Sequence, residues 1–227
     1  MGVMDGAAAT LLPMLFGDLS IDRWPAAAAE SDPPDELPWS AFVQARDHLA
    51  AGDQDLAIRA WASVAQPGPW ESRHTLQAWH FLRAAGVRPD ESIAHQVLGV
   101  VAEISVDGAH DALAAYRIGG VRYLNHAGPI VVVEDGPADL AVRAGRFLDA
   151  AQAVASRIGP WTEPELPDLP VGHSRFTMLT PAGPHLGQGP DDVLQADPMA
   201  QPLFATATDL FLAVVELQPP GAPAPIT

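Results

Sequence analysis

The chain has 227 residues, and its 12 basic and 28 acidic side chains give it a formal charge of −16 at neutral pH. Every basic residue is an arginine and cysteine is absent, which excludes catalytic lysines, thiol nucleophiles, cysteine-ligated metal clusters and disulfides. The excess negative charge argues against binding to nucleic acid or to an anionic membrane surface, because both favour lysine and arginine.

Residues 1–37 are expected to form a loose acidic leader, with at most one short helix near Leu11–Leu19. The stretch ends in the acidic, proline-containing run Glu30–Glu36, which is typical of loose chain. Asp5 and the lack of an early arginine argue against a secretory signal. No apolar run approaches the ~20 residues that a membrane helix needs. Together with the absence of cysteine, these features predict a cytoplasmic protein with no membrane contact.

Residues 38–96 are predicted to form a helical subdomain. Ser40 can cap a helix that ends near Ala51, a second helix is expected at Gln54–Ala65, and a third runs from about Glu71 to Ala85. The first two resemble a single tetratricopeptide-like helical hairpin. No second copy follows, so the pattern predicts a helical hairpin and not a solenoid.

Residues 97–217 are predicted to form an α+β domain, because the hydrophobic period changes from helical to alternating at Val97. Turn signals divide its first part into a four-stranded antiparallel meander, in which Gly119-Gly120 marks a two-residue hairpin. In chain order the expected elements are strands at about 97–106, 112–118, 121–126 and 130–134, a helix at 137–158, a proline-rich connector at 159–172, strands at 173–180 and 185–188, and a helix from 197 to about 217.

The predicted fold class is therefore α+β: an N-terminal helical hairpin plus one helix, then an antiparallel meander sheet of about six strands packed by two long helices. Residues 218–227 are rich in proline and are expected to form a disordered tail. In outline the order of elements is loosely similar to profilin-like and roadblock-like sensor and adaptor modules. A similarity of fold carries no function by itself.

Five segments of the chain resemble an uncharacterised bacterial protein family. They are Glu71–Arg83, Val97–Glu103, Arg122–Gly128, Arg157–Trp161 and Met178–Pro190. The resemblance covers about residues 45–215 and leaves the leader unmatched. The family has no established activity, so the resemblance implies no catalytic residue and no cofactor.

The most specific candidate site follows from the predicted two-residue hairpin. That loop pairs Arg117 with Arg122 across two strands and places His126 further along the same face. Like charges directly opposed on a sheet are unfavourable, so the pair calls for an anion nearby. The anion is either a ligand carboxylate or phosphate in a cleft or, more simply, the side chain of Glu103 on the first strand.

Polar residues of the later strands extend this candidate surface. His173 and Arg175 alternate with apolar residues in the strand at 173–180, and His185 and Gln188 lie in the glycine- and proline-rich segment 181–190. Histidine titrates near neutral pH and can serve in acid–base chemistry. The alternative is that these residues are solvated strand side chains and part of a tight hairpin. No GxSxG, HExxH or EF-hand motif accompanies them, and no metal site is expected.

These observations favour a non-catalytic cytoplasmic module that binds a protein partner or a second copy of itself. The alternative is a small-molecule binding protein for an anionic ligand, or a hydrolase-like enzyme, that uses the Arg117/Arg122/His126 face. The two hypotheses differ in one observable feature, because the second requires those side chains to line a concave pocket. Neither hypothesis calls for a cofactor.

Overall fold

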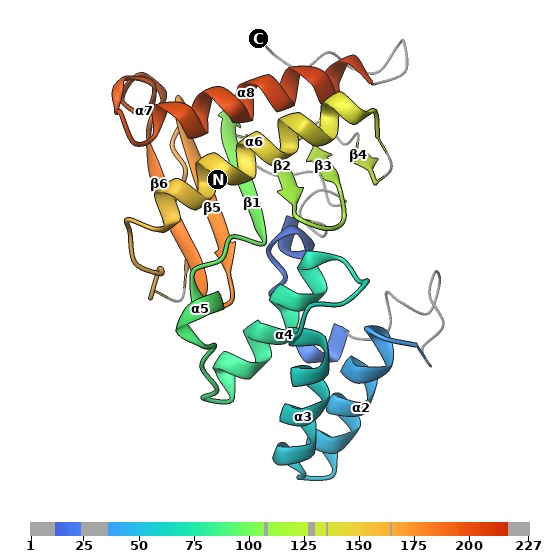
Figure 1. Ribbon diagram of the computed structural model, residues 1–227. Coiled ribbons are helices and arrows are strands. Elements are labelled where there is room, and N and C mark those ends of the chain that lie inside the picture. The colour runs from blue at the N-terminus through green and yellow to red at the C-terminus, as the bar shows by residue number, and fades with distance from the viewer. Residues whose placement is uncertain are drawn as a thin grey trace.

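The computed structural model describes residues 12–23, 36–106, 109–126, 130–134, 136–163 and 165–217, and Figure 1 shows its α+β fold. The helical part comprises η1 (Ile21–Arg23), α2 (Trp39–Ala50), α3 (Gln54–Ala65), α4 (Ser72–Ala84) and α5 (Glu91–Ala94). The predicted helical hairpin corresponds to α2 and α3, and α4 packs against α3. Aromatic side chains fill the space between them, with the Trp61 and Phe81 rings stacked at a centroid separation of 5.1 Å.

In the described part of the chain, the strands form one antiparallel sheet in the order β4-β3-β2-β1-β5-β6. The strands are β1 (Gly99–Val106), β2 (Ala109–Tyr116), β3 (Val121–Leu124), β4 (Ile130–Val133), β5 (His173–Thr180) and β6 (Gly183–Pro190). The four-stranded meander and the six-stranded sheet are thus confirmed. The likeness to profilin-like or roadblock-like modules is not confirmed.

One face of the sheet packs against two long helices, α6 (Ala138–Ala155) and α8 (Gln201–Glu216), which cross it side by side (Figure 1). Alternate strand residues such as Val100, Tyr123 and Met178 point toward these helices and are buried with Phe147 and Leu210. This layer is the largest apolar core of the described structure, and burial of its side chains is the main stabilising contribution to the fold.

The opposite face is covered by α4 and by the N-terminal residues 12–23, of which 12–16 are helical. Leu15 is 3% exposed and packs near Leu76 of α4. The Tyr116 hydroxyl donates a hydrogen bond to the Leu15 carbonyl at 2.6 Å, and the Gln77 side chain bonds both the N–H and the carbonyl of Leu19 at 2.9 Å. These residues lie in the stretch expected to be a loose leader, yet they are packed against the sheet.

Most element boundaries follow the sequence closely, and α3 and β5 have the predicted bounds. The largest difference lies near the C-terminus, where the short helix α7 (Asp191–Ala196) precedes α8 and was not predicted. β6 (Gly183–Pro190) also extends two residues beyond the expected strand at each end. None of the described helices combines the length and the apolar composition that crossing a lipid bilayer requires.

Candidate functional site

The hairpin between β2 and β3 has a longer loop than the predicted one, and Arg122 lies opposite Ala114. The loop is held by the start of α4: the Ser72 N–H donates to the Ile118 carbonyl at 2.9 Å, and the Ile118 N–H donates to Ser72 Oγ at 3.0 Å. The prediction that Arg117 and Arg122 oppose each other across the sheet is therefore wrong. The tertiary contact with α4 overrides the local Gly-Gly turn signal.

Each of these two arginines has its own carboxylate partner. Arg122 Nη2 lies 2.8 Å from Glu71 Oε2, at the start of α4. Arg117 Nη1 lies 3.0 Å from Asp149 Oδ1 on α6. The negative charge expected beside the two arginines is thus supplied by two carboxylates, Glu71 at the start of α4 and Asp149 on α6. Neither guanidinium needs an external ligand to balance its charge.

Glu103, which was expected to neutralise that pair, binds Arg175 instead. Arg175 Nε and Nη2 donate to the two Glu103 oxygens at 2.7 and 2.8 Å, and Nη1 donates to the Pro167 carbonyl of the connector at 2.6 Å. Glu103 is 1% exposed and Arg175 is 6% exposed. Since protein oxygens occupy its donors, Arg175 is part of a buried structural ion pair and is not placed to hold a ligand.

His126, which follows β3, belongs to a network around Asp111 of β2. Asp111 Oδ1 accepts the His126 backbone N–H at 2.9 Å and lies 2.6 Å from its Nδ1. Asp111 Oδ2 accepts the Tyr123 hydroxyl at 2.6 Å, and Asn125 donates to that hydroxyl at 2.9 Å. Burial, assisted by the Asp111 carboxylate, raises the pKa of Tyr123 above its usual range. The network fixes the His126 ring, but no other candidate residue belongs to it.

The remaining candidates lie apart on the β5–β6 hairpin. His173 begins β5 and is partly exposed. His185 is fully buried in β6, where its Nε2 lies 3.4 Å from His95 Nδ1 and burial lowers its pKa. Gln188 Nε2 donates to the Asp168 carbonyl at 2.7 Å. The structure therefore does not gather the sequence candidates into one pocket.

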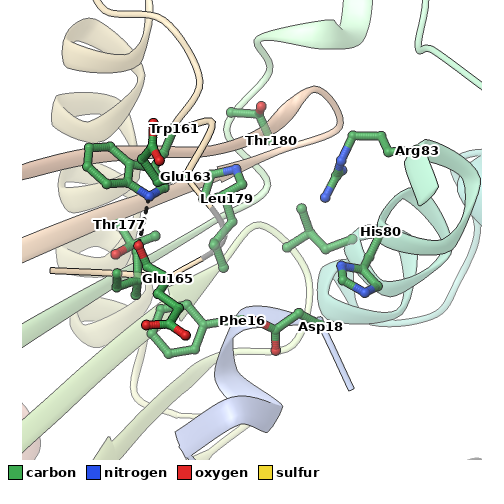
Figure 2. Close-up of a pocket in the computed structure, with 14 residues that line it drawn as sticks. Phe16, Asp18, His80, Arg83, Trp161, Glu163, Glu165, Thr177, Leu179 and Thr180 are labelled. Carbon is green, nitrogen blue, oxygen red and sulfur yellow. Dashed lines mark hydrogen bonds between the residues drawn. The ribbon is translucent and has the colours of Figure 1, made fainter. Parts of the chain in front are cut away.

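A different hollow is formed where four distant segments meet, and we call it the junction pocket (Figure 2). It has a volume of about 200 Å³. Two larger hollows, of about 320 and 580 Å³, lie beside Arg117 and His95 respectively. The residues that line the junction pocket come from the N-terminal segment (Phe16, Gly17, Asp18), α4 (Leu76, His80, Arg83), the connector (Trp161, Glu163, Glu165, Leu166) and the β5–β6 hairpin (Thr177, Leu179, Thr180, Pro184).

The α4 wall of the junction pocket carries its basic side chains. Arg83 Nη1 donates to the Pro181 carbonyl at 2.8 Å, and burial lowers the pKa of the guanidinium. No ion pair joins Arg83 to a carboxylate of the described residues. His80 lies one helical turn earlier on the same face, and burial and the Arg83 charge lower its pKa. This wall therefore presents a partly desolvated cation with unused hydrogen-bond donors.

The connector wall carries an aromatic ring and two carboxylates. The Trp161 backbone N–H donates to the Pro184 carbonyl at 2.7 Å, and its indole N–H donates to the Glu165 carbonyl at 3.2 Å. These two bonds fix the indole beside the connector. Glu163 and Glu165 are exposed at the rim, and no described cation pairs with either carboxylate.

Two further polar residues complete the lining. Thr177 of β5 is 1% exposed, and its hydroxyl has no hydrogen-bond partner within the described structure. A buried hydroxyl without a partner is costly, so this hydroxyl is available for a hydrogen bond to a molecule in the pocket. Asp18 reaches solvent at the pocket mouth, but the surrounding protein atoms displace enough water to raise its pKa to about 6.

Sequence reasoning missed this site because its walls are far apart along the chain. Asp18 falls in the stretch expected to be a loose leader, and Trp161, Glu163 and Glu165 fall in the connector expected only to link two elements. The one local signal was the spacing of His80 and Arg83, three residues apart on one face of a helix.

Within the described residues, no group of three or more histidine, aspartate or glutamate side chains is arranged to hold a metal ion. No protein-family model matches the chain, and comparison with curated proteins and with solved structures found no match.

Proposed function

We propose that this chain binds a small anionic molecule in the junction pocket, with the anion held by Arg83. The observation that carries the proposal is a partly buried guanidinium without a carboxylate partner among the described residues, in a chain with 28 acidic side chains. Removing a cation from water is costly unless an anion or hydrogen-bond acceptors compensate. A bound carboxylate would accept the unused N–H groups of Arg83.

The size and lining of the pocket support a small ligand. Its volume of about 200 Å³ lies below the range of roughly 300–1,000 Å³ that drug-sized ligands need. Apolar side chains such as Phe16, Leu76 and Leu179 surround the few polar groups, which is the usual composition of a ligand site. No hydrogen bond between described residues joins His80 to a hydroxyl in this pocket, so the geometry supports binding over nucleophilic catalysis.

This proposal keeps the class of ligand that the sequence suggested but changes its location. The Arg117/Arg122/His126 face was the expected anion site, and protein groups occupy those side chains. The cytoplasmic location expected from the sequence remains a proposal, supported by the absence of cysteine.

Titration with hexanoate, succinate and inorganic phosphate, followed by calorimetry and by thermal shift, tests the proposal. At least one of these anions is expected to bind the wild-type chain. The variant Arg83→Gln is expected to weaken that binding about tenfold or more, the effect of losing one charge-assisted hydrogen-bonding group. Arg59→Gln, which removes an exposed arginine on α3, is the matched control. Absence of binding by all three anions, or equal loss in both variants, would overturn the proposal.

Partner binding, the function that the sequence favoured, is the second candidate because edge strand β4 exposes apolar side chains. Ile130 is 41% exposed, Val132 is 52% exposed, and β4 pairs with β3 alone in the described sheet. We propose a second copy of this chain as the occupant, since antiparallel pairing of β4 with β4 is self-complementary, as a two-fold dimer requires.

Sedimentation of the wild-type chain and of Val132→Lys tests this second candidate. A dimer that Val132→Lys converts to a monomer would support it. Val193→Lys, at a position 54% exposed on α7, is the control and is expected to leave the dimer intact. A wild-type chain that sediments as a monomer at all concentrations would exclude it.

A further inference from the structure

The charged side chains of the junction pocket come from three segments, and Asp18 of the N-terminal segment lies on the same side as the basic residues of α4. Figure 2 shows Arg83 and His80 of α4 on one side, and Trp161, Glu163 and Glu165 of the connector on the other. Neither the guanidinium nor the two carboxylates has an ion-pair partner within the described chain. Opposite charges that could neutralise each other are thus held apart by the walls of the pocket.

The connector side has the composition of a cation site. An indole ring attracts an ammonium or guanidinium group through its π face, and the hydrogen bonds of Trp161 to Pro184 and to Glu165 fix that ring. The indole N–H bond also fixes the Glu165 backbone beside the ring. A cation held against the ring would lie in the part of the pocket that Glu163 and Glu165 also line.

The buried hydroxyl of Thr177 provides independent support for a ligand between these two sides. It is 1% exposed, lines the pocket and lacks a hydrogen-bond partner among the described residues. Thr180 on the same strand shows the contrast, because its hydroxyl donates to the Gly183 carbonyl at 2.8 Å. A polar ligand atom beside Thr177 would supply the missing bond.

We infer that the ligand of the junction pocket is a zwitterion, with its anionic end at Arg83 and its cationic end between Trp161, Glu163 and Glu165. The inference rests on the proposed function and adds the second charge to it. A ligand of this kind balances both walls of the pocket at once. A simple anion leaves the two glutamates uncompensated and is repelled by them, and a simple cation is repelled by Arg83.

Three probes of the same length separate these possibilities: hexanoate, hexylamine and 6-aminohexanoate, which carries both charges at neutral pH. In calorimetry with the full chain, 6-aminohexanoate is expected to bind at least about tenfold more tightly than hexanoate, because it gains a charge-assisted contact and a cation–π contact. Shorter amino acids of the same series, such as 4-aminobutyrate and glycine, then report the spacing between the two charged sides.

The double variant Glu163→Gln/Glu165→Gln tests the cationic side. It is expected to abolish the advantage of 6-aminohexanoate and to tighten hexanoate binding, because the two carboxylates that repel a simple anion are removed. The control double variant Glu36→Gln/Glu216→Gln removes the same charge from exposed positions outside the pocket and is expected to keep the tenfold preference. All four substitutions are at exposed residues, and circular dichroism verifies that the variants fold.

Each outcome separates this inference from the function on which it rests. If hexanoate binds in an Arg83-dependent way but 6-aminohexanoate binds no better, the zwitterion inference is wrong and the anion site stands. If no probe binds, both are wrong. If hexylamine binds as tightly as 6-aminohexanoate, the pocket is a cation site, which overturns both as well.

Discussion

At the scale of single residues, the buried Glu103–Arg175 pair illustrates two different effects on stability. Removing one partner of such a pair destabilises the fold strongly, whereas replacing both partners with apolar residues costs little. Glu103 is 1% exposed, so replacing Arg175 with Met leaves the Glu103 carboxylate buried without its partner. Loss of one partner of a buried pair typically costs about 3–5 kcal/mol. Urea unfolding should show that loss for Arg175→Met. Most of it should be recovered when Glu103→Leu is added.

The exposed pair Arg46–Asp47 provides the control for that experiment. Its two side chains are 40% and 66% exposed, so solvent screens their interaction. Asp47→Asn is therefore expected to change the free energy of unfolding by less than about 1 kcal/mol. Equal effects of Arg175→Met and Asp47→Asn would contradict the buried position of the β5 arginine.

Asp18 gives a residue-scale prediction of pH dependence. Its folded pKa is raised from 3.8 to about 6 by desolvation, so the folded chain binds more protons than the unfolded chain between these values. Stability linked to Asp18 is therefore fully present below about pH 4 and decreases as the pH rises through 6. Asp18→Asn should remove this slope and stabilise the chain at pH 8, by less than about 1 kcal/mol because solvent reaches the group. Thermal melts of the wild-type chain and of Asp18→Asn from pH 4 to 8 measure this slope. Melting temperatures that change with pH in the same way in both proteins would contradict the raised pKa of Asp18.

At the scale of elements, the hairpin between β2 and β3 contains two glycines with positive φ, and Gly120 is the more restricted of the two. Gly120 has a φ of +69°, and a Cβ atom there would lie 2.0 Å from the Val133 carbonyl oxygen. Gly120→Ala is expected to lower the free energy of unfolding by about 1–3 kcal/mol. Gly145→Ala in α6 is the matched control, because its Cβ would meet no heavy atom within 4 Å. The control should stabilise the chain by about 0.5–1 kcal/mol, and urea denaturation that ranks the two variants the other way would refute the assignment.

The same hairpin shows which part of an element can be predicted from sequence. The turn residues Gly119-Gly120 placed β2 and β3 to within a few residues of their observed bounds. The register was wrong because two hydrogen bonds between Ser72 and Ile118 determine the loop. Residues 46 positions apart do not affect the local sequence pattern. The pattern around Gly119-Gly120 therefore predicts the shortest possible turn.

At the scale of the whole molecule, periodicity predicts the layers of the fold but not its junctions. The helical hairpin, most of the strands and the two long helices follow from repeating apolar patterns and turn residues. The junction pocket follows from no such pattern, because Asp18, Arg83, Glu163 and Thr177 belong to four separate segments. Nothing in the local sequence distinguishes these residues from other polar residues of the chain. Only the packing of the folded chain shows that Arg83 lacks a carboxylate partner among the described residues.

The N-terminal segment joins these layers, which leads to a prediction for the stability of the whole chain. Leu15 is 3% exposed and packs with Leu76 of α4 and with Tyr116 of β2. Leu15→Ala is therefore expected to cost about 2–5 kcal/mol, the range for truncating a buried leucine. Leu212→Ala, at a position 56% exposed on α8, should change stability by no more than about 0.5 kcal/mol.

The stability lost in Leu15→Ala should be shared by the helical part and the sheet, because the N-terminal segment contacts both. Tryptophan fluorescence, measured in a Trp161→Phe background, reports mainly on the α2–α4 cluster, which contains Trp39, Trp61 and Trp79. Far-UV circular dichroism reports on the whole backbone. Coincident transitions by the two probes, both displaced in Leu15→Ala, are expected for one cooperative unit. If only the dichroism transition moves, the helical part unfolds independently of the sheet. An unchanged midpoint in Leu15→Ala would mean that the segment does not stabilise the face it covers.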